Sequence, residues 1–403
     1  MLDAHRDARL QDIQTPFYLY DTDLLQQTLD VIRAEAGAHP CYHVHYAIKA
    51  NSNPVILRQI AAAGLGADCV SGGEIHAAVE SGFKPDSIVF AGVGKADWEI
   101  RLALQTGIGA FNVESTEELD VIAQLAAEQQ LTARISLRIN PDVAAHTHAH
   151  ITTGRAENKF GIDRNHMVEV IRKTLATPHL DFVGLHFHIG SQMLDMSDFL
   201  ALALRINEIQ DQLEAEGIRL PSINVGGGLG VDYDHPDRHP IPDFAAYFAT
   251  YSDNLRLRPG QHLHFELGRS VVAQMGSLIS RVLYVKHGTV KRFAILDAGM
   301  TELIRPALYG ALHAIQTFDI DGGRPCFASA RRDQDYVTYD VVGPICESSD
   351  VFARDYPLPP LQRGDMVAIR SAGAYGEVMA SCYNCRQLPA AHTVNDLQER
   401  LKQ

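Results

Sequence analysis

The stretch HVHYAIKANSNPVILRQIAAAGLGADCV, residues 43–70, contains a strand, a helix and the strand that follows. Residues 43–48 are β-favouring, and residues 53–64 place apolar side chains at helical spacing before a terminal glycine. The first strand ends on one ammonium group, Lys49, in a turn of small and polar residues. The stretch therefore predicts a βα unit with a lysine at the carboxyl end of its strand.

The same unit recurs along the chain. Strand-like runs end at Ile48, Cys69, Ala91 and Val113, which are 21, 22 and 22 residues apart, and a helical stretch follows each run. Four more strand-like runs follow at longer intervals, at residues 133–140, 181–189, 222–227 and 262–267. Eight parallel strands that alternate with crossover helices close most naturally into a (β/α)8 barrel of the TIM type.

The pattern changes after about residue 275. From there on, short strand-like runs alternate with turns rich in Gly, Pro and Asp, which is typical of a mostly β domain. The segment TPFYLYD, residues 15–21, is also strand-like and precedes the barrel. We therefore expect a barrel domain over residues 20–275 and a β-rich domain over residues 276–403, with residues 1–19 joining the second sheet.

Composition argues against several classes of protein. The 403 residues are 46% apolar, enough for one large core and a smaller one, and the net charge of −14 is spread along the chain. This charge argues against a nucleic-acid or anionic-membrane partner. No apolar run approaches the ~20 residues of a membrane span, and residues 1–12 resemble neither a signal nor a transit peptide. The expected location is the cytoplasm.

Two patterns are compatible with a metal site, but each has a simpler interpretation. The C-x-x-C pair Cys382 and Cys385 has no second pair or adjacent histidine that would complete a tetrahedral zinc site. The alternating histidines of HTHAH, residues 146–150, lie in a long insertion that fits a lid better than a metal site. We therefore expect reduced cysteines and no bound metal.

Unusual polar residues gather at the ends of the predicted strands, where barrels of this type hold their active sites. They are Lys49, Asp68, Ser71, Asn140, His186, His188, Glu266 and Arg269. Asp68 and Ser71 could instead cap the helix that follows them. The seventh strand is followed by Gly226, Gly227 and Gly228, in the loop where this fold commonly binds phosphate through backbone N–H groups. A phosphorylated ligand is predicted.

A lysine, a phosphate site and a carboxylate at one barrel end suggest pyridoxal 5'-phosphate (PLP). The Lys49 amine would form a Schiff base with the cofactor aldehyde, and the cofactor would stabilise a carbanion. An ionised Glu266 would favour the proton on the pyridine nitrogen. A flat imidazole could stack on the ring. His188 is our choice, and His186, on the same strand face, competes with it.

Nine motifs, in order from about residue 15 to residue 390, resemble those of the fold-type III PLP-dependent decarboxylases, and among them the diaminopimelate decarboxylases. They are YAIKAN, GADCVSGGE, INP…THxxITTG…NKFGI, GLHFHIGSQ, NVGGGLG, ELGRS, LDAGMTELIRPALYG, GPICESSD and SAGAYG. The resemblance implies an alanine-racemase-like barrel, a second β domain and a homodimer with active sites at the subunit interface. The chain departs from the family at Leu267, where proline is commoner.

The resemblance also implies roles for individual residues. The residues implied in cofactor binding are Lys49, Asp68, His188, Ser191, Gly226, Gly227, Gly228, Glu266 and Tyr375. Those implied in substrate binding are Arg269, Arg305, Tyr309, Glu347 and Tyr375. The catalytic set is Lys49, His188 and Cys346, with Cys346 as the proton donor. Cys346 and Glu347 would come from the neighbouring subunit, with Glu347 on the distal amino group of the substrate.

The predicted reaction is the decarboxylation of meso-2,6-diaminopimelate to L-lysine and carbon dioxide, the last step of lysine biosynthesis. Two arginines and a carboxylate suit the zwitterionic far end of this small amino acid, whereas arginines would repel a purely cationic tail. Three alternatives stay open. They are a decarboxylase of another basic or modified diamino acid, a metal-dependent barrel hydrolase that uses His186 and His188, and a non-catalytic PLP-carrying barrel, a class that lacks the second β domain.

Overall fold

The computed structural model describes residues 13–143, 159–321, 324–328 and 336–402. The chain forms two compact units. The barrel unit comprises Gln27–Gly230 and Pro242–Val271, and the β-rich unit comprises Met1–Gln26, Val231–Ile241 and Val272–Gln403. The short segment Val231–Ile241 thus groups with the β-rich unit, and the domain boundaries at residues 20 and 275 stay a prediction.

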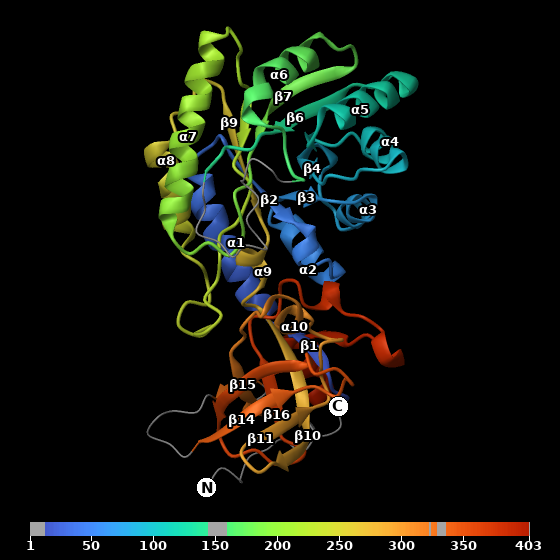
Figure 1. The fold of residues 1–403 in the computed structure, drawn as a ribbon, viewed down its shortest axis with the longest axis vertical. Coiled ribbons are helices and arrows are strands. Elements are labelled where there is room, and N and C mark those ends of the chain that lie inside the picture. Colours follow the sequence, from blue (N-terminus) through green and yellow to red (C-terminus); the bar gives the residue numbers. More distant parts are fainter. Residues whose placement is uncertain (1–12, 144–158, 322–323, 329–335, 403) are drawn as a thin grey trace. The chain divides into compact units, whose positions relative to one another are not determined.

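The barrel unit is a closed ring of eight parallel strands (Figure 1). In order they are β2 (Tyr42–Ala47), β3 (Gly66–Cys69), β4 (Ile88–Phe90), β5 (Ala110–Val113), β6 (Ala133–Arg138), β7 (Leu180–His186), β8 (Ser222–Asn224) and β9 (His262–Leu267). The first strand pairs with the last and closes the ring. The predicted (β/α)8 barrel is confirmed, but β7 and β8 end earlier than predicted, at His186 and Asn224.

Several helices begin at a side chain that caps them. Asn53 accepts a hydrogen bond from the N–H of Val55, and Ser71 accepts one from the N–H of Glu74. Ser71 is therefore a capping residue, as one interpretation allowed.

The helices up to residue 272 are α1 (Thr22–Gly37), α2 (Pro54–Ala62), α3 (Gly72–Glu80), α4 (Asp97–Thr106), α5 (Thr116–Gln129), α6 (Met167–Ala176), α7 (Met196–Ala215), α8 (Phe244–Asn254) and α9 (Arg269–Val272). Among the helices of the described residues, none is long and apolar enough to cross a membrane.

The β-rich unit is built on a nine-stranded sheet. Seven strands lie in the order β13 (Arg324–Ala328), β12 (Ile315–Asp321), β16 (Met366–Ile369), β10 (Gly276–His287), β11 (Arg292–Leu296), β14 (Val337–Val342) and β15 (Val351–Leu358). The other two are β1 (Phe17–Tyr20), antiparallel to β10, and β17 (Ala390–Thr393), parallel to β1. The segment TPFYLYD thus joins the second sheet through Phe17–Tyr20, while residues 1–12 lie outside the described residues.

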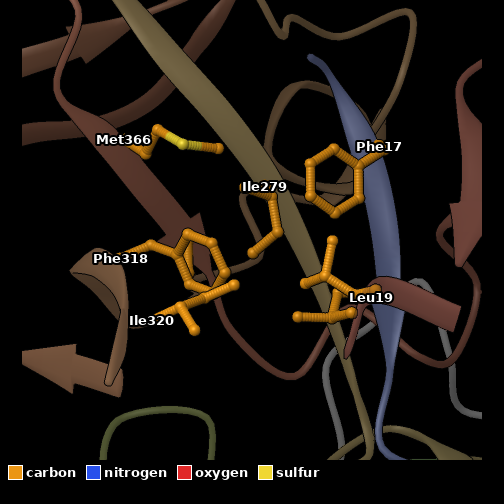
Figure 2. Packing of buried hydrophobic residues seen from close by; sticks show 8 residues of the cluster. Phe17, Leu19, Ile279, Phe318, Ile320 and Met366 are labelled. Atoms are coloured by element: carbon orange, nitrogen blue, oxygen red, sulfur yellow. The ribbon is translucent and has the colours of Figure 1, made fainter. Parts of the chain in front are cut away.

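A hydrophobic cluster holds β1 against this sheet. Figure 2 shows Phe17 and Leu19 of β1 beside Ile279 of β10, and Phe318 and Met366 on neighbouring strands. All five side chains are at most 5% exposed. Since burying one such side chain is worth about 1.5–3 kcal/mol, packing as well as hydrogen bonding fixes the strand that precedes the barrel.

Two pairs of histidines join the first and last strands of the barrel. His43 Nε2 lies 2.9 Å from His262 Nδ1, and His45 Nε2 lies 2.9 Å from His264 Nδ1. Each pair needs one ring nitrogen to donate and the other to accept, so at least one ring must be neutral. The pKa of His45 and that of His264 are both lowered, because burial outweighs the opposing effect of the Glu266 charge. The closing contact of the barrel therefore depends on uncharged imidazoles.

These pairs predict an acid-sensitive fold. An unfolded histidine has a pKa of about 6.5, so as the pH falls the unfolded chain takes up protons before the buried rings do. The stabilisation is present above that pH and is lost below it. Between about pH 7.5 and about pH 5.5, the thermal midpoint of the wild type should fall more than that of a His45→Asn/His264→Asn variant. The exposed His166→Asn is the control, and equal falls in wild type and double variant would contradict this prediction.

Candidate active site at the carboxyl end of the barrel

Lys49 lies directly beyond β2, in the single 3-10 turn Ile48–Ala50. Its Nζ is 3.1 Å from Oδ2 of Asp68 in β3. The side chain of Asp68 is 1% exposed, whereas that of Lys49 is 43% exposed. The buried carboxylate therefore anchors an amine whose side chain stays half-exposed at the barrel end.

Asp68 carries a carboxyl group that titrates close to neutral pH. Burial, together with the charge of Glu266, raises its pKa to about 6, although Lys49 opposes the shift. Its second oxygen, Oδ1, is buried without a hydrogen-bond partner. Because such a group can hold or release a proton and already contacts Lys49, Asp68 is placed to exchange a proton with the lysine amine.

Glu266 is a buried carboxylate at the end of β9 with donors on both oxygens. Its Oε1 accepts from Nδ2 of Asn112 and from Nδ2 of Asn224, each at 2.8 Å. Its Oε2 lies 3.0 Å from Nε2 of His186. Burial alone would raise the pKa of Glu266, but His186 and then Lys49 outweigh burial and hold the pKa well below its usual value. The carboxylate is ionised.

The sequence did not predict the two amides of this network. Asn112 lies in β5 and Asn224 in β8, while His186, which ends β7, was considered only for ring stacking. A signal was present, because each asparagine is the one amide side chain of its strand, and buried amides require partners. What the sequence lacks is the direction in which each amide points.

His188 faces the glycine loop. The N–H of Gly227 points at its Nδ1 over 3.4 Å. Burial, and then the charges of Arg138 and Lys49, lower the pKa of His188 to about 3. The ring is therefore neutral at physiological pH, as a flat stacking partner would be. Because His186 is bonded to a carboxylate, the geometry favours His188 for that role.

The loop after β8 has no room for side chains. A Cβ on Gly227 would lie 1.9 Å from the backbone oxygen of Glu266, and one on Gly226 would lie 2.4 Å from that of Phe187. Gly226 and Gly228 also have left-handed φ values of +69° and +107°. The glycines therefore keep bare backbone packed at the carboxyl end of the barrel.

Arg269 and Ser191, two of the predicted site residues, contact each other. Arg269 begins α9, and its Nη2 donates to Oγ of Ser191 at 3.1 Å. Leu267 is fully buried and extends β9, where it pairs with Tyr46 of β2. The leucine that replaces the commoner proline thus continues the strand.

A second lysine follows β4. The side chain of Lys95 is 1% exposed. Its Nζ donates to Oε1 of Glu118 at 2.6 Å, to the carbonyl of Gly92 at 2.8 Å and to that of Asn112 at 2.9 Å. An ammonium has three donors, so these contacts use all of them. The half-exposed Lys49 is therefore the better candidate for a covalent bond to a ligand.

Arg305, Tyr309 and Tyr375 belong to the β-rich unit and are placed within it. Arg305, 6% exposed, begins α10 (Arg305–Tyr309), and its Nη1 is 3.0 Å from both Tyr233 Oη and His313 Nε2. Tyr309 is half-exposed at the other end of this helix. Tyr375 is half-buried, with a left-handed φ of +57°.

Cys346 and Glu347 are exposed on the loop between β14 and β15. The carboxylate of Asp350 shapes this loop, accepting from the N–H of Ile345 at 2.7 Å and from that of Met300 at 2.6 Å. Two motifs far apart in the sequence, LDAGMTELIRPALYG and GPICESSD, are joined in this way.

The metal hypotheses have no support in the part of the chain that the structure describes. In that part, no group of three or more His, Cys, Asp or Glu side chains is arranged to hold a metal ion. His186 bonds Glu266 and His188 faces Gly227, so the H-x-H pair does not converge on one point. The HTHAH segment, residues 146–150, lies outside the described residues.

The residues at the barrel end fit PLP. An ionised carboxylate offers about four lone-pair sites, so Glu266 can accept one more hydrogen bond, from a pyridinium N–H. The neutral His188, the bare glycine loop and the half-exposed Lys49 complete a set suited to an aromatic aldehyde that carries a phosphate. The fold and the site define a barrel of the pyridoxal-dependent class.

Comparison with known proteins narrows this class. Residues 27–273 match the family of pyridoxal-dependent decarboxylases over its pyridoxal binding domain. The chain is 60% identical over 389 residues to diaminopimelate decarboxylase of Bacteroides thetaiotaomicron, covering 96% of this chain and 98% of the relative. The Helicobacter pylori diaminopimelate decarboxylase crystallised with L-lysine is 41% identical, with a TM-score of 0.86 over 95% of this chain and 92% of that one. This chain belongs to the diaminopimelate decarboxylases.

A more distant structure shares only the fold. Lysine/ornithine decarboxylase of Vibrio vulnificus, crystallised with putrescine, is 23% identical, with a TM-score of 0.79 over 97% of both chains. The barrel with its β-rich unit is therefore common to decarboxylases of different substrates.

A single methyl group should disrupt this site. In a Gly227→Ala variant the new Cβ would collide with the backbone of Glu266, and we expect affinity for PLP to fall at least about tenfold. Gly73→Ala is the matched control, because its Cβ would meet only the Oγ of Ser71, at an ordinary contact distance of 3.7 Å. Absorbance titration of the apoenzyme with PLP measures the effect, and circular dichroism verifies folding. Unchanged affinity in a folded Gly227→Ala protein would contradict the site.

Proposed function

We propose that this chain removes one carboxylate from meso-2,6-diaminopimelate to give L-lysine and carbon dioxide, with PLP bound at Lys49. The observation that carries the proposal is the ionised Glu266, which lies on β9 beside β2, the strand that Lys49 follows. Two amides and an imidazole from other strands hold its carboxylate. The 60% identity to the Bacteroides enzyme and the L-lysine in the Helicobacter crystal support the choice of substrate and product.

When bound, PLP supplies an electron sink for the electron pair left by the departing carbon dioxide. Glu266 keeps the pyridine nitrogen protonated, because a buried carboxylate beside that nitrogen is stabilised by the positive charge. Asn112, Asn224 and His186 keep the carboxylate ionised and oriented. His188 would stack on the ring, and the glycine loop, Ser191 and Tyr375 would hold the phosphate.

Asp68 is the ionic partner of the Lys49 amine. With PLP bound, the Asp68 carboxylate, 3.1 Å from the Lys49 amine, would stabilise that amine as an ammonium whenever it is not joined to the cofactor. Burial and the charge of Glu266 raise the pKa of Asp68, whereas the contact with Lys49 lowers it, so the ionised carboxylate and the lysine ammonium stabilise each other.

The far end of the substrate is a carboxylate and an ammonium group on one carbon. We assign Arg269, Arg305 and Tyr309 to the carboxylate and Glu347 to the ammonium, because guanidinium pairs with carboxylate and a carboxylate accepts from ammonium. The exposed Cys346 is the proposed proton donor to the product.

We further propose a homodimer in which Cys346 and Glu347 serve the active site of the partner. Their exposure on a loop ordered by Asp350 supports this assignment. We place the reaction in the cytoplasm, because six cysteines in 403 residues are too few to suggest a disulfide framework.

The choice of substrate predicts a clear pattern of turnover. Supplied separately with PLP, meso-diaminopimelate should release carbon dioxide, whereas lysine, ornithine and arginine should release at most about one hundredth as much, because arginines repel a cationic tail. Release of labelled carbon dioxide measures this. Turnover of ornithine or arginine with none of diaminopimelate would contradict the substrate while leaving the fold intact.

Glu347 should act on the substrate and not on the cofactor. In Glu347→Gln the charge that attracts the distal ammonium is lost, so KM for diaminopimelate should rise about tenfold or more with PLP affinity unchanged. Ser348→Ala, its exposed neighbour on the same loop, is the control and should match the wild type. If the affinity for PLP fell by the same factor as KM for diaminopimelate rose, Glu347 would be a structural residue.

A further inference from the structure

Cys382 and Cys385 flank a single turn of the β-rich unit. Both thiols are exposed, and the 3-10 turn Tyr383–Cys385 begins directly after Cys382. The N–H of Arg386 donates to the carbonyl of Tyr383 in this turn. The C-x-x-C spacing places the two cysteines three residues apart, and a disulfide requires their Cα atoms to lie about 4.4–6.8 Å apart. A bond between the two thiols therefore needs a rearrangement that stays within this turn, where Asn384 and Cys385 both have a left-handed φ of +56°.

The tyrosine between these cysteines contacts Glu347. Tyr383 Oη donates a hydrogen bond to Oε1 of Glu347 at 2.8 Å. This bond to Glu347 raises the pKa of Tyr383, so the phenol stays protonated and keeps donating. The conformation of the turn thus sets one hydrogen bond of the carboxylate that we assign to the distal ammonium of the substrate.

We propose that Cys382 and Cys385 form a reversible dithiol switch. A low-molecular-weight disulfide oxidises them to an intrachain disulfide, which re-forms the turn, withdraws Tyr383 from Glu347 and weakens binding of the substrate. The effect on substrate binding rests on the proposed function of Glu347, whereas the thiol chemistry does not.

The reaction is two steps of thiol–disulfide exchange. One cysteine thiolate attacks the small disulfide, forms a mixed disulfide and releases one small thiol. The other cysteine thiolate then attacks the protein sulfur of that mixed disulfide and releases the second small thiol. The two cysteines lose two electrons and two protons, and the small disulfide gains both. A dithiol reductant reverses the reaction.

The remaining cysteines are placed differently. Cys69 is buried and Cys41 is partly buried, while Cys326 is exposed on β13 with no cysteine close to it in the sequence. Cys346 is exposed next to Glu347, and a bond to Cys346 would remove the proposed proton donor and stop turnover. A bond between Cys382 and Cys385 would instead raise KM, so the two outcomes are distinguishable.

The experiment uses the holoenzyme with glutathione disulfide as the oxidant. After alkylation and digestion, mass spectrometry should find a peptide in which Cys382 and Cys385 are linked. KM for diaminopimelate should rise about three- to tenfold, as for loss of one hydrogen bond at a charged group, with kcat nearly unchanged. Dithiothreitol should restore both readouts.

Four variants complete the test. Cys382→Ser and Cys385→Ser should each abolish the cross-link and the rise in KM, whereas Cys326→Ser should leave both as in the wild type. Tyr383→Phe should show the raised KM while fully reduced. Absence of the cross-link, a cross-link through Cys346, or a cross-link with unchanged KM would overturn the proposal. Failure of the proposed function would appear separately, as absence of diaminopimelate turnover by the reduced wild type.

Discussion

An ionised carboxylate inside a barrel is the constraint on which this site depends. A buried charge is costly unless its oxygens are hydrogen-bonded, and Glu266 meets this requirement with three side chains. Asn112, Asn224 and His186 come from β5, β8 and β7, and Glu266 itself lies on β9. The closed ring of strands brings side chains from β5, β7 and β8 to the carboxylate on β9. The ionised state of Glu266 therefore depends on the closure of the barrel.

The charge of Glu266 then acts on its neighbours. It adds to burial in raising the pKa of Asp68 to about 6, which leaves that carboxyl close to its titration point beside Lys49. It also opposes the effect of burial on the pKa of His45, its register partner on β2, and of His264. Both rings stay neutral and join β2 to β9. One carboxylate therefore influences both the proton chemistry at the barrel end and the contact that closes the ring.

Much of this arrangement could be predicted from the sequence. The near-constant spacing of the strand ends predicted the barrel, and the positions of Lys49, the glycine loop and Glu266 at strand ends predicted the site, because strand ends converge in this fold. Asn112 and Asn224 could not be predicted, since an amide in a buried strand shows neither its direction nor its partner. The role of Arg305 came from resemblance alone, and a distant decarboxylase of other substrates shares the fold, so the fold does not determine the substrate.

The network around Glu266 should keep the carboxylate ionised and the pyridine nitrogen of PLP protonated. The most direct test is the nitrogen-15 chemical shift of PLP labelled at that nitrogen, measured in the holoenzyme at neutral pH. We expect the shift of a pyridinium in the wild type and that of a neutral pyridine in Glu266→Gln. A neutral pyridine in the wild type would contradict it.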